Sequence, residues 1–260
     1  MVLTSIAKLI NFMIWYLNAI ILILLSISCS AQRFQDEIVL VNVEHIGRSG
    51  LADLIRKVNR CDPKVIAIDL CFSDRGKDDS QLVFALTEVN NLVMSSLIDS
   101  DCLDQNLEFE SMLCSLGEFL TNSSTGFTNA VVENNGLNTI KRFAISAMVD
   151  GALEYHFAVQ IAFEFDSIAA AAFVESHPRI IDVDYKNGLR KYKILSASEI
   201  VELGDVSCDT KGKIVMMGFL GPGDADKFFT PLNQSSDKPD KYGVEYLANI
   251  VSQVLEYGKK

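Results

Sequence analysis

The sequence predicts an α/β fold: a layered, mostly parallel sheet with helices on both faces and an inserted β-hairpin region. Three observations carry this prediction. Apolar runs typical of buried strands alternate with helical apolar periodicities through the first hundred residues. An Asn-Asn-Gly turn signal at residues 134–136 divides the irregular middle of the chain. Apolar residues make up 49% of the 260 residues, enough for a large core without disulfides or metals.

The first half of the predicted domain reads as strand, helix, strand, helix, strand. Residues 38–43, 65–70 and 92–97 are apolar runs of strand length. Asp62-Pro63 predicts the end of the first helix, and residues 78–80 can cap the second. This order favours parallel strands joined by helical crossovers. The periodic apolar residues are Leu51, Leu54, Ile55 and Val58 in the first helix and Leu82, Ala85, Leu86 and Val89 in the second.

The middle of the chain is less regular. Residues 102–120 predict a helix with Phe109, Leu113, Leu116 and Leu120 on its inner side, and residues 121–125 a polar turn. Residues 127–132 and 140–149 are expected to pair as a hairpin around the Asn-Asn-Gly turn. Residues 158–174 predict one long apolar helix, which charged and amide side chains interrupt too often for a membrane span.

The last third of the chain returns to strands and a helix. Residues 180–185 and 191–195 predict two strands joined by a Lys-Asn-Gly turn, and residues 213–218 predict another buried strand. A long polar loop covers residues 221–240. The final helix is expected near Gly243, with Val244, Leu247, Ala248, Val251, Val254 and Leu255 toward the core.

The charge balance of the chain is acidic. All 34 acidic residues and all but one of the 23 basic residues follow residue 31, and the formal net charge is −11. Nucleic acid and anionic membrane surfaces repel such a chain, so neither is an expected binding partner of the folded part. The simplest reading of the acidic surface is good solubility.

Residues 1–31 read as a segment that targets or anchors the chain. Residues 10–27 are mostly apolar, and a helix of this length spans about 27 Å, close to the hydrocarbon core of a bilayer. The segment is interpreted as an uncleaved signal anchor, as a signal peptide cut after Ala31, or as a lipoprotein signal at Cys29. A helix buried in the core is the competing interpretation.

The first three interpretations all export residues 32–260. We therefore expect a single-pass protein of the cell membrane with an extracytoplasmic domain, periplasmic or extracellular. A secreted or lipid-anchored protein is the alternative.

The six cysteines show no CxxC pair. The predicted strand at residues 65–70 separates Cys61 from Cys71 by roughly 20 Å, and a disulfide needs Cα atoms within about 7 Å. Cys102 and Cys114 would lie about 18 Å apart on one helix. We expect most of these thiols to be small core hydrophobes.

Candidate site residues follow from the predicted sheet. Ligands of open parallel sheets bind outside the carboxyl ends of the strands, which places Glu44, Arg48, Asp69 and Asp226 near a pocket for a small molecule or cation. The alternative is structural: Asp69 would hydrogen-bond a neighbouring loop, and Asp226 with Thr230 would cap the turn before Pro231.

The remaining motifs give weaker indications of function. Residues 218–223 are glycine-rich but lack the GK[ST] ending of a phosphate loop. His45, His156 and His177 lie far apart, so no zinc site is predicted, and His177 is expected to cap a helix end. No GxSxG elbow occurs. No metal and no cofactor are therefore expected, and Lys141 and Arg142 are expected to face solvent more than a bound anion.

The order of these pieces resembles the type-two CHASE domain, an extracellular sensor of cyclases, histidine kinases and related bacterial receptors. The resemblance covers residues 36–257. The family's closing motifs are resembled by four segments in order: residues 211–218, 226–231, 242–245 and 248–250 (KGKIVMMG, DKFFTP, YGVE and ANI). The family's opening strand, second strand and next helix start are resembled by residues 38–43, by residues 63–72 (PKVIAIDLCF) and by Asp79. The family's central hairpin is resembled by residues 126–129, 135–136 and 140–142 (GFTN, NG and IKR).

The resemblance adds Arg142, the hairpin arginine, to the candidate ligand-binding residues. Residues 46–50 (IGRSG) depart from the aromatic and proline-rich turn usual in the family, so Arg48 alone can be matched there. The family usually continues into further membrane spans and an effector, whereas this sequence stops at Lys260. A separate membrane signalling partner is therefore expected.

The resemblance implies an extracytoplasmic, non-catalytic sensor with an unidentified small-molecule or protein ligand. Two alternatives from other classes are a small exported metal-dependent α/β enzyme that uses Asp69 and Asp226, and a structural subunit of an envelope complex. A metal-dependent gain in thermal stability that is lost in Asp69→Ala would favour the enzyme.

Overall fold

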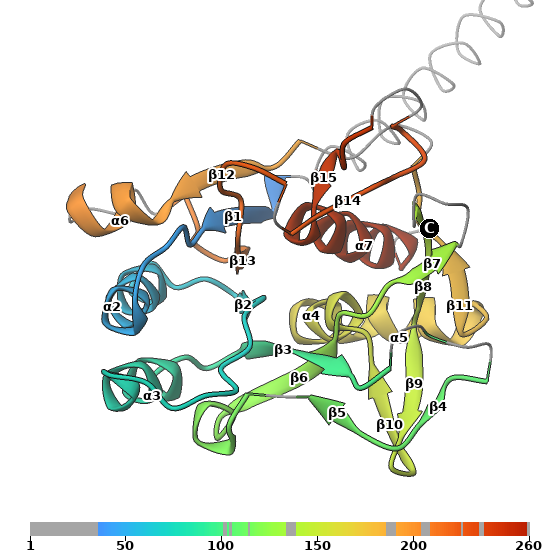
Figure 1. Cartoon of the computed structure of the whole chain (residues 1–260), viewed down its shortest axis with the longest axis horizontal. Coiled ribbons are helices and arrows are strands. Elements are labelled where there is room, and N and C mark those ends of the chain that lie inside the picture. Colours follow the sequence, from blue (N-terminus) through green and yellow to red (C-terminus); the bar gives the residue numbers. More distant parts are fainter. Residues whose placement is uncertain are drawn as a thin grey trace, which may run out of the picture.

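The computed structural model describes residues 36–100, 103, 106–113, 115–133, 139–185, 191–203, 209–224, 226–233 and 237–258. A central sheet runs through the molecule in the order β12-β1-β13-β2-β3, and β3 also pairs with β5 and β6 (Figure 1). All of these pairings are parallel except that of β3 with β5. The strands are β1 (Ile38–Asn42), β2 (Val65–Ile68), β3 (Leu92–Ile98), β5 (Met112–Leu113), β6 (Ser123–Phe127), β12 (Lys193–Ser196) and β13 (Ile214–Gly218).

Helices cover both faces of this sheet, as predicted. Helices α2, α3 and α6 lie on one side and α4, α5 and α7 on the other (Figure 1). Because successive side chains of a strand point to opposite faces, Leu40 of β1 joins one buried cluster and Val41 the other. The helices are α2 (Arg48–Asn59), α3 (Asp79–Thr87), α4 (Phe157–Phe165), α5 (Ser167–Ser176), α6 (Ala197–Leu203) and α7 (Gly243–Tyr257).

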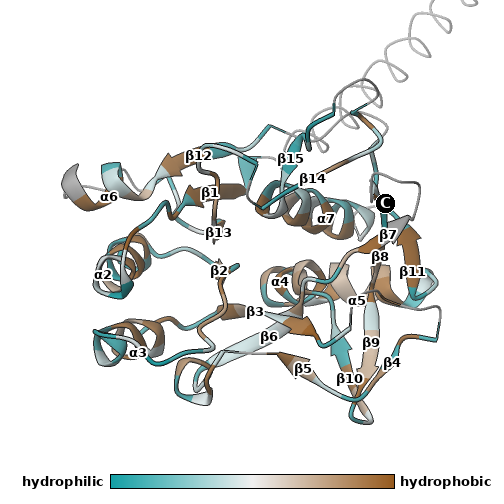
Figure 2. Cartoon of the chain, viewed as in Figure 1, coloured by the Kyte–Doolittle hydropathy of each residue, from teal (hydrophilic) through white to brown (hydrophobic). Residues whose placement is uncertain are grey.

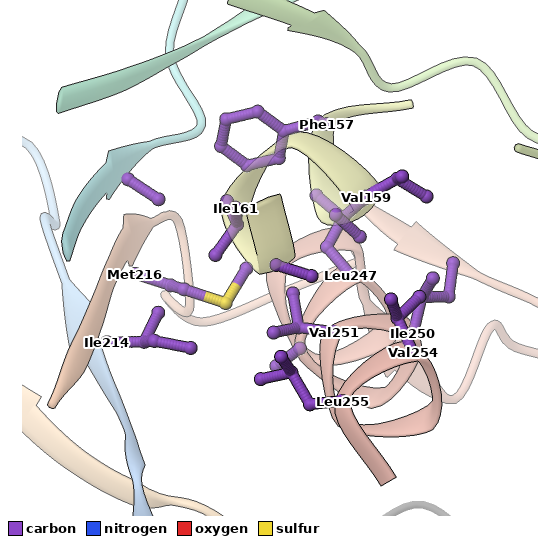
Figure 3. Close-up of a cluster of buried hydrophobic side chains, with 14 of the residues drawn as sticks. Phe157, Val159, Ile161, Ile214, Met216, Leu247, Ile250, Val251, Val254 and Leu255 are labelled. Atoms are coloured by element: carbon purple, nitrogen blue, oxygen red, sulfur yellow. The ribbon is translucent and has the colours of Figure 1, made fainter. Parts of the chain in front are cut away.

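Helix α7 forms much of one core layer. Figure 3 shows Leu247, Val251 and Leu255 of α7 facing Ile214 and Met216 of β13. All of these side chains are buried, and each contributes about 1.5–3 kcal/mol relative to an exposed position. Hydropathy colours follow the same layering: β1 and β3 are largely hydrophobic, and α2 and α3 combine hydrophobic and hydrophilic residues (Figure 2). The apolar spacing seen in the sequence therefore predicted these elements correctly.

The predicted helix at residues 102–120 is wrong. The described part of this segment forms β4 (Glu108–Phe109), β5 and the 3₁₀ turn η1 (Gly117–Phe119). Leu113, expected inside, is 54% exposed, because β5 pairs with the edge of β3. Phe119 carries the apolar contact instead, with its ring 5.2 Å from that of Phe72. The predicted polar turn at 121–125 is also wrong in part, because β6 begins at Ser123.

The inserted hairpin region is confirmed in part: Phe127 belongs to β6 of the central sheet, and residues 140–149 are divided between two strands. Strand β7 (Val131–Glu133) pairs antiparallel with β8 (Thr139–Ala144), and the turn between them lies outside the described residues. A second hairpin joins β9 (Ser146–Val149) to β10 (Ala152–Tyr155) through Asp150 and Gly151, both with positive φ. Asp-Gly at these two positions is typical of a type I′ turn. Two further short strands are β14 (Lys227–Phe228) and β15 (Lys241–Tyr242), which pair antiparallel.

Two further predictions are wrong, one of a single long helix and one of a hairpin. The helix expected over 158–174 is two helices, because Asp166 leaves helical geometry and accepts a hydrogen bond from the Ala169 N–H at 3.1 Å, capping α5. The strands expected at 180–185 and 191–195 do not form a hairpin. Strand β11 (Ile180–Asp182) pairs with β8, whereas β12 pairs with β1 in the central sheet.

The predicted membrane segment, residues 1–31, lies outside the described residues. Across the described part of the chain, no helix combines the length and the apolar character needed to cross a bilayer. Cys61, which is buried, and Cys71, which is exposed, are not joined by a disulfide, in agreement with the geometric argument against their pairing. The other cysteines lie outside the described residues.

Candidate functional site

A cavity of about 310 Å³ lies at the carboxyl ends of β2, β3 and β6. Asp69 follows β2 directly, Ser95 and Ser96 belong to β3, and residues 128–130 follow β6. The first turn of α7 closes the cavity with Gly243, Tyr246 and Leu247. This is the edge at which open parallel sheets bind ligands, and the volume is at the lower end of the usual range for ligand pockets.

Asp69 and Asp226 both line this cavity, as the sequence predicted for a shared pocket. Burial, and after it the negative charge of Asp226, raise the pKa of Asp69 from 3.8 to about 7, while a hydrogen bond from Ser95 opposes the shift. Burial also raises the pKa of Asp226. The cavity therefore holds two carboxyl groups that are costly to ionise together.

The backbone places Asp226 at the start of α7. Asp226 has a positive φ of 60°, and its carbonyl accepts a hydrogen bond from the Gly243 N–H at 2.9 Å. A Cβ on Gly243 would lie 3.5 Å from Oδ1 of Asp226 and 3.3 Å from the ring of Phe228. The carboxylate of Asp226 therefore lies against the first residue of the helix, where the helix dipole favours negative charge.

Tyr246 lines the cavity and carries an unusual buried hydroxyl. Its side chain is 2% exposed, and its hydroxyl has no hydrogen-bond partner among the described residues. Burial keeps the pKa of this hydroxyl well above its usual value of 10, with a smaller effect from Tyr185, so it stays a neutral donor and acceptor. Buried polar groups without a partner are rare in native structures.

Glu44 and Arg48 are held elsewhere. Glu44 follows β1 and accepts a hydrogen bond from the Ser196 hydroxyl at 2.6 Å. Arg48, the first residue of α2, forms an ion pair with Asp79 and lies over the rings of Phe72 and Phe119, 5.8 and 5.5 Å from their centroids. Neither residue lines the cavity.

Arg142 lies on β8, in the small sheet with β7 and β11, where it is half-buried. Its Nε has no hydrogen-bond partner among the described residues. Ile140, two residues earlier on the same strand, lines the cavity, and Arg142 does not.

The structural alternative for Asp226 is contradicted. The side chain of Asp69 accepts a hydrogen bond from Ser95 of β3. Thr230 does not act with Asp226: its N–H and hydroxyl both donate to Asp240, at 2.9 and 2.8 Å. The turn before Pro231 is therefore capped by Asp240, which leaves the Asp226 side chain at the cavity.

The histidines occupy separate sites. His177 ends α5, and its Nδ1 lies 2.8 Å from the Phe173 carbonyl, which confirms its predicted capping role. His156 caps α4: its Nδ1 accepts from the Ala158 N–H at 3.3 Å, and its ring lies 5.4 Å from the rings of Phe127 and Phe143. Burial lowers the pKa of His156 to about 3. Across the described residues, no three His, Cys, Asp or Glu side chains cluster as metal ligands would.

Sequence reasoning missed Ser95 and Tyr246. A signal existed for Ser95, because a Ser-Ser pair interrupts an otherwise apolar strand at its carboxyl end. Tyr246 carried no such signal, since a tyrosine on the apolar side of a helix is ordinary core composition. The pairing of Arg48 with Asp79, far apart in sequence, was also missed.

The fold and the cavity together define an α/β domain with a ligand-sized site at the edge of its parallel sheet. The family model of the CHASE2 domain matches residues 28–260, and the chain belongs to this family of extracellular sensor domains. Comparison with curated proteins and with solved structures found no match.

Proposed function

We propose that this chain is an extracytoplasmic, non-catalytic sensor that binds a ligand in the Asp69–Asp226 cavity and passes its state to a separate signalling partner across the membrane. The family match carries the proposal, because it extends over residues 28–260 and thus over the whole described body. CHASE2 domains are sensor domains, so we expect this chain to bind a ligand and to have a signalling output.

The cavity supports the ligand-binding part. Its position at the carboxyl edge of the sheet, its volume of about 310 Å³ and its two uncompensated carboxyl groups are properties of a binding site. A ligand can shift a conformational equilibrium only through unequal affinity for two states. Helix α7 and the segment of Asp226 both reach the cavity, so a ligand that draws them together would favour a closed arrangement.

The location is tested by labelling cysteines in intact cells. The full chain is expressed in a bacterium, treated with a membrane-impermeant maleimide, and digested for mass spectrometry. We expect label on Cys71, which is exposed, and none on Cys61, which is buried and reports that the domain is folded. Label on Cys71 that appears only after lysis would contradict an extracytoplasmic domain.

The signalling output is tested by purification of the full chain from detergent-solubilised membranes of its native cell. We expect a membrane kinase or cyclase to copurify, and the Asp69→Asn and Asp226→Asn variants to change its activity without changing the amount recovered. Recovery without any effect of these variants would leave the cavity outside the signalling route and contradict that part of the proposal.

A further inference from the structure

The cavity is selective in charge. Among the described residues that line it, the charged side chains are Asp69 and Asp226, and both are acidic. The neighbouring Lys227 points elsewhere, with its ammonium 3.5 Å from Oδ1 of Asp224 and 4.8 Å from the centre of the Tyr242 ring. An anionic ligand would meet two carboxyl groups and no compensating cation, whereas a cation would be attracted to both.

The walls of the cavity are largely apolar. The lining includes Leu70, Leu97, Ala130, Ile140, Phe228 and Leu247. A bare metal ion gains nothing from such walls and needs six or more oxygen ligands if it is Ca²⁺ or Mg²⁺. The described residues offer no cluster of three acidic, histidine or cysteine side chains. An organic cation would satisfy both features, because its charge meets the carboxylates while its carbon chain is removed from water.

A second polar group points to a ligand independently of the acidic pair. Tyr246 lines the cavity, and its hydroxyl is buried without a hydrogen-bond partner among the described residues. The nearby Tyr185 hydroxyl, in contrast, donates to the Ile140 carbonyl at 3.0 Å. A buried hydroxyl left unpaired costs free energy, and a ligand with an N–H or O–H group would remove that cost.

We infer that the cavity binds a small organic cation, a primary ammonium compound with a short carbon chain, whose charged nitrogen is held by Asp69 and Asp226 and whose polar hydrogens can reach Tyr246. The inference rests on the proposed function, since it names the ligand class of that same site. It assigns the two carboxylates to charge recognition and the apolar walls to the carbon chain.

The protonation of the cavity makes the inference sharper. The titratable groups that line it are Asp69, Cys71, Asp226 and Tyr246. Burial and the charge of Asp226 raise the pKa of Asp69 to about 7, so near neutral pH the empty cavity holds a proton on this pair for part of the time. A bound ammonium group would replace that proton. Its affinity should therefore rise as the pH increases from 6 to 8.

Isothermal titration of the full chain in detergent with propylammonium tests the inference. We expect binding with a Kd in the millimolar range, about the strength that so small a ligand can reach. The affinity should be several-fold higher at pH 8 than at pH 6. Propan-1-ol, which has the same carbon chain without the charge, should bind at least tenfold more weakly.

Four variants assign the site. Asp69→Asn and Asp226→Asn should each weaken propylammonium binding at least tenfold, and Asp69→Asn should remove the dependence on pH near 7. Tyr246→Phe should weaken it several-fold. The matched control is Asp53→Asn, which removes one negative charge from a 59% exposed side chain on α2, across the sheet from α7, and should leave binding unchanged.

Three results would overturn the inference: no binding of propylammonium to the wild-type chain, equal binding by Asp69→Asn, or Ca²⁺ binding that excludes propylammonium and depends on Asp69. The proposed function stands or falls separately. Maleimide label on Cys71 in intact cells together with no ammonium binding would refute the ligand class and leave the extracytoplasmic location in place. Ammonium binding without such label would do the opposite.

Discussion

The cavity around Asp69 and the aromatic cluster around His156 both bury a titratable side chain, with opposite consequences. Asp69 lines open space beside a second carboxyl group, and its pKa rises to about 7. His156 is fully buried against Phe127 and Phe143, with its Nδ1 used to cap α4, and its pKa falls to about 3. In each case burial favours the neutral form.

The two regions differ in whether the side chain faces a cavity and in whether a charged group lies beside it. No cavity described here is lined by His156, and rings surround it, so its neutral form is part of the packing. Asp69 faces a cavity and a like charge, so a ligand can relieve its cost. Burial and a shifted pKa alone do not distinguish a binding group from a core group, and the contrast can be tested by stability measurements.

The largest effect is expected for His156→Asn. The pKa of His156 falls from 6.5 in the unfolded chain to about 3 in the folded one, so its contribution is complete above pH 6.5 and is lost as the pH falls toward 3. The loss amounts to about 3–5 kcal/mol. Urea unfolding at pH 7, 5.5 and 4 should show a steeper acid-induced loss of stability in the wild type than in the variant. Parallel profiles would refute a neutral buried His156.

The next largest effect is expected for Asp69→Asn, with the opposite sign. The folded pKa of about 7 lies above the unfolded value of 3.8, so the contribution of Asp69 is complete below pH 3.8 and is lost as the pH rises through 7. At pH 8 the variant should be more stable than the wild type by about 2–4 kcal/mol, and this advantage should shrink toward pH 4. A variant less stable than the wild type at pH 8 would contradict the uncompensated cavity.

A smaller gain is expected for Tyr246→Phe. The change removes a buried hydroxyl without a described partner and should raise the free energy of unfolding by about 1 kcal/mol. The matched change Tyr185→Phe removes a hydroxyl that donates to the Ile140 carbonyl and should lower it by a similar amount. Both are read from urea unfolding at pH 7. A loss of stability in Tyr246→Phe would mean that the hydroxyl already has a partner.

The smallest effect is expected for Arg48→Met, which removes the ion pair between Arg48 and Asp79. The arginine contacts Asp79 and the rings of Phe72 and Phe119, but both charged side chains remain partly exposed. Loss of these contacts should lower the thermal midpoint by roughly 2 °C. Arg75→Met, at a side chain that is 80% exposed, is the control and should change nothing measurable. A drop as large as that of a core variant would show that the pair anchors α2.

The pKa of Asp79 should change little in Arg48→Met. The Gly76 N–H, which donates to the Asp79 carboxylate at 2.8 Å, is the main cause of its lowered pKa, and Arg48 is a smaller one. Because the folded pKa lies below the unfolded value, the contribution of Asp79 is present above pH 3.8 and is lost on acidification. NMR titration of this carboxyl in both proteins measures the difference.

The central sheet and half of the cavity were predictable from sequence for one physical reason. Strands buried on both faces are continuous apolar runs, so β1, β2, β3 and β13 stand out, and the residue after each run marks the carboxyl edge. This rule located Asp69. Asp226 was found through the family resemblance of residues 226–231 and through its expected place at the same edge.

The remainder depended on contacts between distant residues. Phe109, Leu113 and Leu116 repeat at helical spacing, yet β5 pairs with the end of β3 that β6 leaves open, and this pairing outweighs local periodicity. The Asp150-Gly151 turn was readable from sequence and was overlooked. Glu44 and Arg48 were expected at the pocket but do not line it, because Ser196 and Asp79, from other parts of the chain, hold their side chains elsewhere.

The central position of β13 in the sheet affects the order in which the chain can fold during synthesis. Ile214 pairs with both Ile38 and Val65, so β1 and β2 are joined only through β13, which comes near the end of the chain. A nascent chain that has passed the ribosome only as far as residue 200 carries two unfilled strand edges and no α7 to close the cavity. We expect such a chain to stay loosely folded during synthesis and the cavity to be completed last.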